Sequence, residues 1–205
     1  MTATRAALNR FYPIVPDSAW LSRLAPLGIK TVQLRIKDAE PEQLRREIEI
    51  SLDIARQFEC QLIVNDYWQL AMDAGADFVH LGQEDLAAAD LKCIKAAGIR
   101  LGVSTHDEAE LAIALAVEPD YIALGPIYET KLKAMKWAPQ GLARVAEWKS
   151  KIGALPLVAI GGITPQRAPG VMSAGADSVA VITDFVTHTN PEERVAEWVS
   201  WSDGD

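Results

Sequence analysis

The chain has 205 residues, of which 49% are hydrophobic and 23% are charged, and its formal net charge is −8 at pH 7. This length and composition predict a single globular domain over residues 1–205, and the negative charge argues against a binder of nucleic acid or of an anionic membrane. No apolar run approaches the roughly 20 residues of a transmembrane helix. Residues 1–10 lack the apolar core of a secretory signal and are expected to form a peripheral or flexible segment. Cys60 and Cys93 have neither metal-binding nor disulfide-framework spacing, which predicts reduced thiols and a cytoplasmic location.

Short apolar segments alternate with amphipathic segments along the chain. The apolar segments are typical of strands, expected at 11–15, 31–37, 61–66, 78–82, 99–106, 121–127, 155–162 and 178–183. The amphipathic segments predict helices at 17–28, 40–58, 67–75, 90–98, 107–116, 140–150, 164–175 and 191–201. This alternation favours a parallel sheet closed into a single (β/α)8 TIM barrel. An open doubly wound sheet is disfavoured, because it would carry a GxGxxG turn after its first strand, where FYPIVPDSAW has none.

Polar and titratable residues gather at the predicted C-terminal ends of the strands. In a (β/α)8 barrel these ends meet at one face, which is where active sites form. The residues concerned are Gln33, Arg35, Lys37, Asn65, Asp66, Asp85, Ser104, Thr130, Lys131, Lys133, Gly161, Gly162, Ile182 and Thr183. The longest loop, 128–139, also lies at this face and is expected to be mobile or ligand-binding.

The second predicted strand, TVQLRIK, places Arg35 and Lys37 on its polar side. Buried cations need partners, so these side chains predict an anion site, unless they form the solvated edge of a strand. Asp66 and Asp85 follow two other strands and provide hard oxygen ligands that suit Mg²⁺ together with substrate phosphates. Helix N-caps are the alternative for both carboxylates. With the metal in place, Arg35, Lys37 and Lys133 would neutralise a diphosphate.

A second anion site is predicted after the seventh strand. Gly161 and Gly162 precede an expected helix start at Thr164–Pro165, and glycines there let backbone N–H groups approach a phosphate. Barrels commonly bind phosphate after strands seven and eight. His106, after the fifth strand, is a candidate general base, although a structural hydrogen-bonding role is favoured for it and for His80.

Several segments follow one another in order from about residue 11 to 185: QLRIK, NDYW, HLGQEDL, LGVSTH, GPIYET with a following lysine, APQGL, AIGGI and SVAVIT. Together they resemble the thiamine-phosphate synthase family. The first three are specific to that family, whereas GPI and AIGG occur in many phosphate-binding barrels. The resemblance implies a Mg²⁺-dependent transferase that joins hydroxymethylpyrimidine diphosphate to thiazole phosphate. It implies a dissociative substitution, in which pyrophosphate leaves and the thiazole nitrogen captures the pyrimidine-methyl cation.

The resemblance also implies roles for individual residues. The pyrimidine diphosphate would be bound by Gln33, Arg35, Lys37, Asn65, Ser104 and Lys133, and the implied catalytic residues among them are Arg35, Lys37, Ser104 and Lys133. Mg²⁺ would be held by Asp66 and Asp85. The thiazole phosphate would be bound by Thr130, Lys131, Leu132, Gly162, Ile182 and Thr183. The expected partners are therefore small phosphorylated molecules.

The loop after the sixth strand departs from the family pattern, since GPIYETKLK stands where a sequence close to GPIFPTxTK is usual. Glu129 replaces the proline and Leu132 replaces the second threonine, which adds a negative charge and removes a hydroxyl. We therefore expect weaker thiazole-phosphate binding with the chemistry retained, and Lys131 or Lys136 as a substitute charge. Two alternatives stay open: a thiazole tautomerase of the same superfamily, and a non-catalytic paralogue that binds thiamine phosphates.

Overall fold

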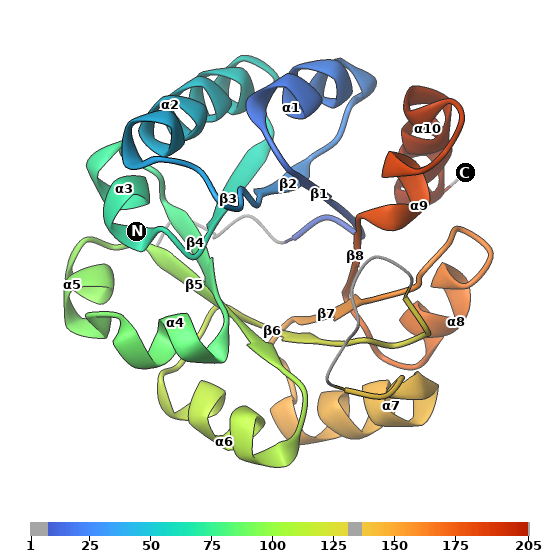
Figure 1. The fold of residues 1–205 in the computed structure, drawn as a ribbon. Helices are drawn as coiled ribbons and strands as arrows, with labels where there is room; N and C mark the ends of the chain where they lie inside the picture. Colours follow the sequence, from blue (N-terminus) through green and yellow to red (C-terminus); the bar gives the residue numbers. More distant parts are fainter. Residues whose placement is uncertain (1–7, 131–136, 205) are drawn as a thin grey trace, which may run out of the picture.

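The computed structural model describes residues 8–130 and 137–204, in which eight parallel strands close into a barrel (Figure 1). The strands pair in chain order, and β8 returns to pair with β1. Their bounds are β1 (Phe11–Val15), β2 (Thr31–Leu34), β3 (Gln61–Asn65), β4 (Phe78–Leu81), β5 (Arg100–Thr105), β6 (Tyr121–Leu124), β7 (Leu157–Ile160) and β8 (Ser178–Val181). The predicted (β/α)8 fold is confirmed.

Helices cover the outside of the barrel (Figure 1). They are α1 (Ser18–Leu24), α2 (Pro41–Gln57), α3 (Trp68–Asp73), α4 (Gln83–Ala88), α5 (Leu91–Ala96), α6 (Glu108–Ala116), α7 (Gly141–Ile152), α8 (Ala168–Ser173), α9 (Thr183–Val186) and α10 (Pro191–Asp203), with a 3₁₀ helix η1 (Ala25–Leu27) after α1. Neither α4 nor α9 is expected from the sequence, because six and four residues are too few to show a helical period.

Several strands end earlier than the sequence predicts. β2 ends at Leu34 instead of residue 37, and β3 ends at Asn65 instead of Asp66. Asp66 has a φ of 67°, which takes the chain out of the extended conformation. The residues that follow β2 and β3 therefore stand beyond the sheet ladder, at the rim of the barrel.

Alternation of side chains along the strands separates two hydrophobic cores. The outer core lies between barrel and helices and includes Phe11 and Val15 of β1. The inner core fills the barrel and consists of Tyr12, Ile14, Ile63, Phe78, Tyr121, Ala123, Val158 and Ala180. Gln33, Asn65 and His80 are buried and share the alternation of this inner set. The interior is thus polar near the face where the strands end.

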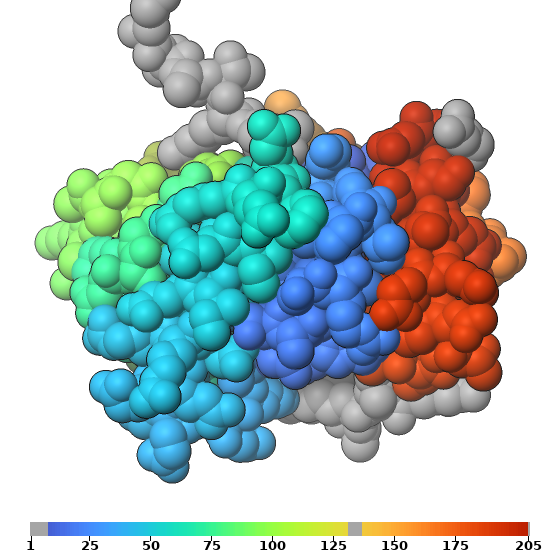
Figure 2. All heavy atoms as spheres, turned by 90° about the horizontal axis from the view of Figure 1, so that it is seen from above, coloured from blue at the N-terminus to red at the C-terminus, as the bar shows by residue number. Residues whose placement is uncertain are grey.

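One side of the molecule is formed by α1 between α2 and α10 (Figure 2). α2 buries Leu44, Ile48 and Leu52 at helical spacing, and full burial of one such side chain contributes about 2 kcal/mol. The Asp17 carboxylate caps α1 by accepting the Trp20 N–H at 2.8 Å. Over the described ranges, none of the helices combines the length and apolar character that crossing a membrane requires.

An ion pair fastens α9 to α10. Arg194 donates from Nε to one carboxylate oxygen of Asp184 at 2.7 Å and from Nη2 to the other at 2.9 Å. Trp198 Nε1 donates to the same carboxylate at 2.8 Å. Both side chains of the pair are largely buried, at 15% and 10% exposed. This bidentate contact fixes the start of α9, where Thr183 follows β8.

Candidate active site

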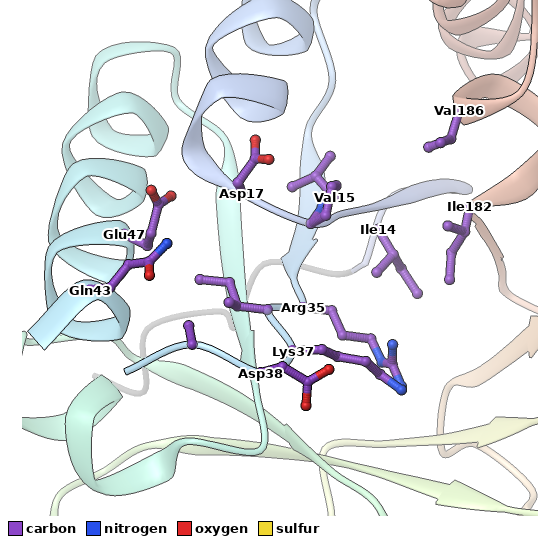
Figure 3. A pocket seen from close by; sticks show the side chains of 13 residues that line it. Ile14, Val15, Asp17, Arg35, Lys37, Asp38, Gln43, Glu47, Ile182 and Val186 are labelled. Atoms are coloured by element: carbon purple, nitrogen blue, oxygen red, sulfur yellow. The ribbon is translucent and has the colours of Figure 1, made fainter. Parts of the chain in front are cut away.

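The cations of TVQLRIK line a cavity at the C-terminal ends of β1 and β2. The Arg35 N–H donates to the Val15 carbonyl at 2.9 Å, so Arg35 continues the β1–β2 pairing beyond the strand. The cavity has a volume of about 440 Å³, and Lys37, Ile14 and Ile182 also line it (Figure 3). Arg35 is partly buried and Lys37 is exposed. The two predicted cations therefore lie together in one cavity, whose lining also includes the carboxylates of Asp17, Asp38 and Glu47.

Two carboxylates in the wall of this cavity already have structural partners. Asp17 caps α1, as described above, and Glu47 Oε2 accepts the Ser18 N–H at 2.7 Å. Both lie on the side of the cavity formed by α1 and α2 (Figure 3). Their negative charge is thus partly neutralised by the N-terminal end of α1.

Asp66 and Asp85 lie beside each other, although they come from the end of β3 and the first turn of α4. Burial raises the pKa of Asp66 to about 6, and the negative charge of Asp85 adds to this shift. The nearby Arg35 guanidinium and a hydrogen bond from Asn65 lower it. The structure therefore brings the two predicted metal ligands together with Arg35 and Asn65.

Helix capping does not account for either carboxylate. The N-cap of α3 is Tyr67 and that of α4 is Gly82, and neither has a side-chain capping bond. The positive φ of Asp66 is a conformation that Asp and Asn tolerate better than most residues. Asp85 is exposed at the rim. Both carboxylates are therefore available to a cation.

This pair fits a hard divalent cation. Mg²⁺ usually binds through one or two carboxylates, waters and substrate phosphates. Within residues 8–130 and 137–204, no group of three or more His, Cys, Asp and Glu side chains could hold a metal ion. The arrangement therefore suits a metal that shares its coordination with phosphate oxygens.

Ser104 lies on β5, and its hydroxyl oxygen is 2.8 Å from Nε2 of His80. Gln83 Nε2 fixes the strand by donating to the Ser104 carbonyl at 2.6 Å. Burial lowers the pKa of His80 to about 3, and Arg35 acts in the same direction. Because His80 is uncharged at neutral pH, it serves as a hydrogen-bonding residue that holds Ser104.

The segment after β6 packs against the turn after β7. The Tyr128 N–H donates to the Gly161 carbonyl at 3.0 Å. Gly161 and Gly162 have φ values of 105° and 64°, and a Cβ on Gly162 would lie 2.5 Å from the Glu129 carbonyl oxygen. Only glycine fits so close an approach. The chain leading to Thr130 is thereby held against Gly162.

The helix start predicted at Thr164–Pro165 is wrong. The Thr164 carbonyl accepts the N–H groups of Arg167 and Ala168 in a turn, and α8 begins only at Ala168. The glycine pair therefore precedes a turn instead of a helix. A short helix, α9, begins close after β8, and its first residue, Thr183, follows Ile182.

Three predicted residues, Lys131, Leu132 and Lys133, lie outside the described residues, as does Lys136. On the far side of that gap, Gln140 Nε2 donates to the His106 carbonyl at 2.8 Å. His106 Nδ1 is 2.7 Å from Glu110 Oε2, which also accepts the His106 N–H at 2.8 Å. These contacts hold His106 through its backbone and Nδ1, which favours the structural role expected for it.

Three residues at or beneath this face are missed by the sequence reasoning. Tyr12 and Tyr121 occupy apolar strand patterns, where nothing in the sequence reveals that their hydroxyl groups lie 3.0 Å apart inside the barrel. Arg167 donates from Nη1 to the Gly162 carbonyl at 2.6 Å, and its guanidinium lies 4.5 Å from the centre of the Tyr128 ring. A cation soon after the glycine pair was the available signal for Arg167.

A closed (β/α)8 barrel whose rim combines cations, a carboxylate pair and a glycine turn defines the class of barrel enzymes that act on small phosphorylated molecules. A family model described as thiamine monophosphate synthase matches residues 12–185. A thiamine-phosphate synthase of Rhizobium etli is 56% identical over 193 residues, which cover 94% of this chain and 95% of that protein. One of Salmonella agona is 47% identical over 186 residues, which cover 91% and 88%.

Among solved structures, a thiamine phosphate pyrophosphorylase from Pyrococcus furiosus superposes with a TM-score of 0.82. Its sequence identity is 24%, and the match covers 95% of each chain, so it shows the shared fold. The family model and the two relatives go further. The chain belongs to the thiamine monophosphate synthase family, and the resemblance seen in the sequence is confirmed.

Proposed function

We propose that this chain is a thiamine-phosphate synthase, which couples hydroxymethylpyrimidine diphosphate with thiazole phosphate and releases pyrophosphate. The observation that carries the proposal is the meeting of Arg35 with Asp66 and Asp85 at one strand-end face of a barrel of this family. A diphosphate that leaves with its bonding electrons develops charge that needs cations and a metal at this position.

The reaction breaks the bond between the pyrimidine methylene carbon and a diphosphate oxygen, and the electron pair leaves with pyrophosphate. The thiazole ring nitrogen then donates its lone pair to the methylene carbon, so no proton has to move. The chain contributes mainly by positioning the reactants and stabilising charge. Arg35, Lys37 and Lys133 neutralise the diphosphate, and the Ser104 hydroxyl and the Gln33 and Asn65 amides bind the same substrate.

Mg²⁺ is the proposed cofactor, held by Asp66 and Asp85. When bound, it would act as a Lewis acid on the oxygens of the diphosphate. The shifted pKa of Asp66 supports this assignment, because two neighbouring carboxylates, one of them partly buried, are stabilised by a cation. The proposed thiazole-phosphate site consists of Thr130, Lys131, Leu132, Gly162, Ile182 and Thr183.

The two free thiols support a cytoplasmic location.

A thiazole tautomerase and a non-catalytic paralogue are the weaker alternatives. A tautomerase acts on a monophosphate and has no evident need for the second cationic pocket around Arg35 and Asp66. The family match and the two relatives favour the synthase over both.

A product assay tests the proposal. The protein is mixed with both substrates and Mg²⁺, and thiamine phosphate is followed by chromatography, with a metal-free sample alongside. We expect product only with metal, loss of product in Asp85→Ala, and unchanged product in Glu84→Ala, whose exposed side chain precedes Asp85 on α4. A folded protein that yields no product at high concentrations of both substrates would contradict the synthase assignment.

A further inference from the structure

We propose that Gln33, Tyr12, Tyr121 and His80 form a hydrogen-bond chain of fixed direction that orients the Ser104 hydroxyl as a donor toward the diphosphate. The diphosphate as recipient rests on the proposed function, whereas the direction of the chain rests on geometry alone. The four residues are positioning residues, since they act through Ser104.

The chain crosses the interior of the barrel from β2 to β5. Gln33 Nε2 donates to Tyr12 Oη at 2.9 Å, and Tyr12 Oη lies 3.0 Å from Tyr121 Oη. Tyr121 Oη is 2.7 Å from His80 Nδ1, and His80 Nε2 is 2.8 Å from Ser104 Oγ. Each link thus has the length of a good hydrogen bond, and together they join five strands.

The donor at one end sets the direction of every link. In the proposed direction, the Tyr12 oxygen accepts from the Gln33 amide, and the Tyr12 proton is donated to the neighbouring Tyr121 hydroxyl. The Tyr121 proton then has to point to His80 Nδ1. A neutral imidazole with an acceptor at Nδ1 carries its proton on Nε2, and that proton points to Ser104 Oγ. The Ser104 oxygen therefore accepts a hydrogen bond from His80. The Ser104 hydroxyl proton is then available to be donated to the diphosphate.

Burial keeps this direction from being lost. Gln33, Tyr12, Tyr121 and His80 are between 0% and 6% exposed, so water does not compete for their protons. Burial also disfavours the charged forms of Tyr12, Tyr121 and His80, and the polar side-chain atoms of all three have hydrogen-bond partners within the chain. All three side chains therefore stay neutral around pH 7.

The backbone makes room for this chain. A Cβ on Gly102, beside Tyr121 in the β5–β6 pairing, would lie 2.1 Å from the tyrosine ring. The Tyr121 ring also stacks on His80, with centroids 5.4 Å apart and an angle of 17° between the planes. Phenylalanine would fill the same space, so packing alone does not require the hydroxyl groups. Ser104 is the one partly exposed member, and the chain therefore ends at the substrate face.

Nitrogen NMR of the imidazole groups tests the direction without any substrate. We expect His80 in the parent protein to be neutral with its proton on Nε2, and we expect this preference to be lost in Tyr121→Phe. His80→Gln assigns the signal. A proton on Nδ1, or a charged His80 at neutral pH, would overturn the chain whatever the enzyme makes.

Steady-state kinetics test the function of the chain. We expect Tyr121→Phe to lower kcat about tenfold to a hundredfold, the range for a hydrogen bond to a charged group, with a smaller change in KM for the pyrimidine diphosphate. Tyr12→Phe provides a second, milder variant. Thr105→Val is the matched control, because it removes the neighbouring buried hydroxyl, which bonds to Ala123 and Trp148 instead.

Testing Tyr121→Phe in a Ser104→Ala variant separates an effect that acts through Ser104 from a nonspecific structural effect of the substitution. If Tyr121 acts through Ser104, Tyr121→Phe has no further effect on kcat once the serine hydroxyl is absent. A full additional loss in that background would refute the proposed route. A parent protein without synthase activity would refute the proposed function instead, and the NMR result would then still decide the direction of the chain.

Discussion

The imidazole of His106 lies parallel to the indole of Trp137, with ring centroids 5.5 Å apart and an angle of 8° between the planes. His106 is held by Glu110 on α6, and Trp137 is the first described residue after the segment that carries Lys133. The stack therefore ties the end of the proposed substrate-binding loop to the rim of the barrel beside β5.

Removal of this stack is expected to weaken substrate binding. His106→Ala loses a ring pair worth about 0.5–1.5 kcal/mol, so we expect KM for the pyrimidine diphosphate to rise up to about tenfold. Steady-state kinetics measure this, with His188→Ala as control, because the ring of the exposed His188 bonds to the backbone of Asn190. An unchanged KM in His106→Ala would show that the stack does not position the loop.

Asp66→Asn is expected to separate stability from activity. Its raised folded-state pKa means that the ionised Asp66 destabilises the metal-free fold at neutral pH. Asn tolerates the positive φ and carries no charge, so the free energy of unfolding should rise by about 1 kcal/mol once solvent screening is allowed for. Metal-dependent activity should fall by about a hundredfold.

Urea unfolding in the presence of a chelator measures the stability part of that prediction. Asp38→Asn is the control, because Asp38 has a similar φ of 56°. A variant of Asp66 that is less stable than the parent in the absence of metal would contradict the expected sign.

His80 is expected to make stability depend on pH. In the unfolded chain its imidazole binds a proton near the ordinary pKa of 6.5, whereas in the folded protein it stays neutral down to about pH 3. The contribution of His80 to the free energy of unfolding is therefore constant above pH 6.5. Below pH 6.5 it falls by about 1.4 kcal/mol per pH unit. The raised pKa of Asp66 has the opposite effect between its two pKa values and partly masks the trend.

Comparison with His80→Gln isolates the histidine, because Asp66 contributes equally to both proteins. The difference in unfolding free energy, parent minus variant, should shrink as the pH falls below 6.5 and stay constant above it. A difference that does not change with pH would mean that folding leaves the pKa of His80 near its ordinary value.

The two cysteines are expected to differ in reactivity. Burial raises the pKa of Cys60 to about 12, and its side chain is 8% exposed, so little thiolate forms at neutral pH. A disulfide reagent applied to the native protein should therefore modify Cys93, which is partly exposed, and spare Cys60. Cys93→Ser should remove the fast reaction and Cys60→Ser should retain it. Equal rates for both thiols would contradict the buried setting of Cys60.

Leu132→Thr is expected to improve thiazole-phosphate binding. The new hydroxyl adds one hydrogen bond to a charged group, which should lower KM for thiazole phosphate about tenfold and leave kcat unchanged. Leu142→Thr, on the exposed side of α7, is the control. A KM no lower than that of the parent would show that Leu132 does not face the phosphate.

The sequence by itself determined the eight strands, their parallel order and the residues at their C-terminal ends. Strand periodicity is a local property, and a closed barrel places every strand end at one face. It also placed Arg35, Asp66 and Asp85 at the rim. Their positions relative to the predicted strands can be read from the sequence alone. The expected helix start at Thr164 failed, since a turn there uses the same residue types as a helix N-terminus.

Only the tertiary structure decided which of these residues meet. Asp66 lies beside Asp85 because a short helix follows β4 directly, and so short a helix has no detectable period. Tyr12 and Tyr121 read as apolar strand residues, yet closure of the barrel brings their hydroxyl groups together inside it. Such contacts depend on the register between strands that are far apart in the chain. The alternation of residues within one strand does not determine that register.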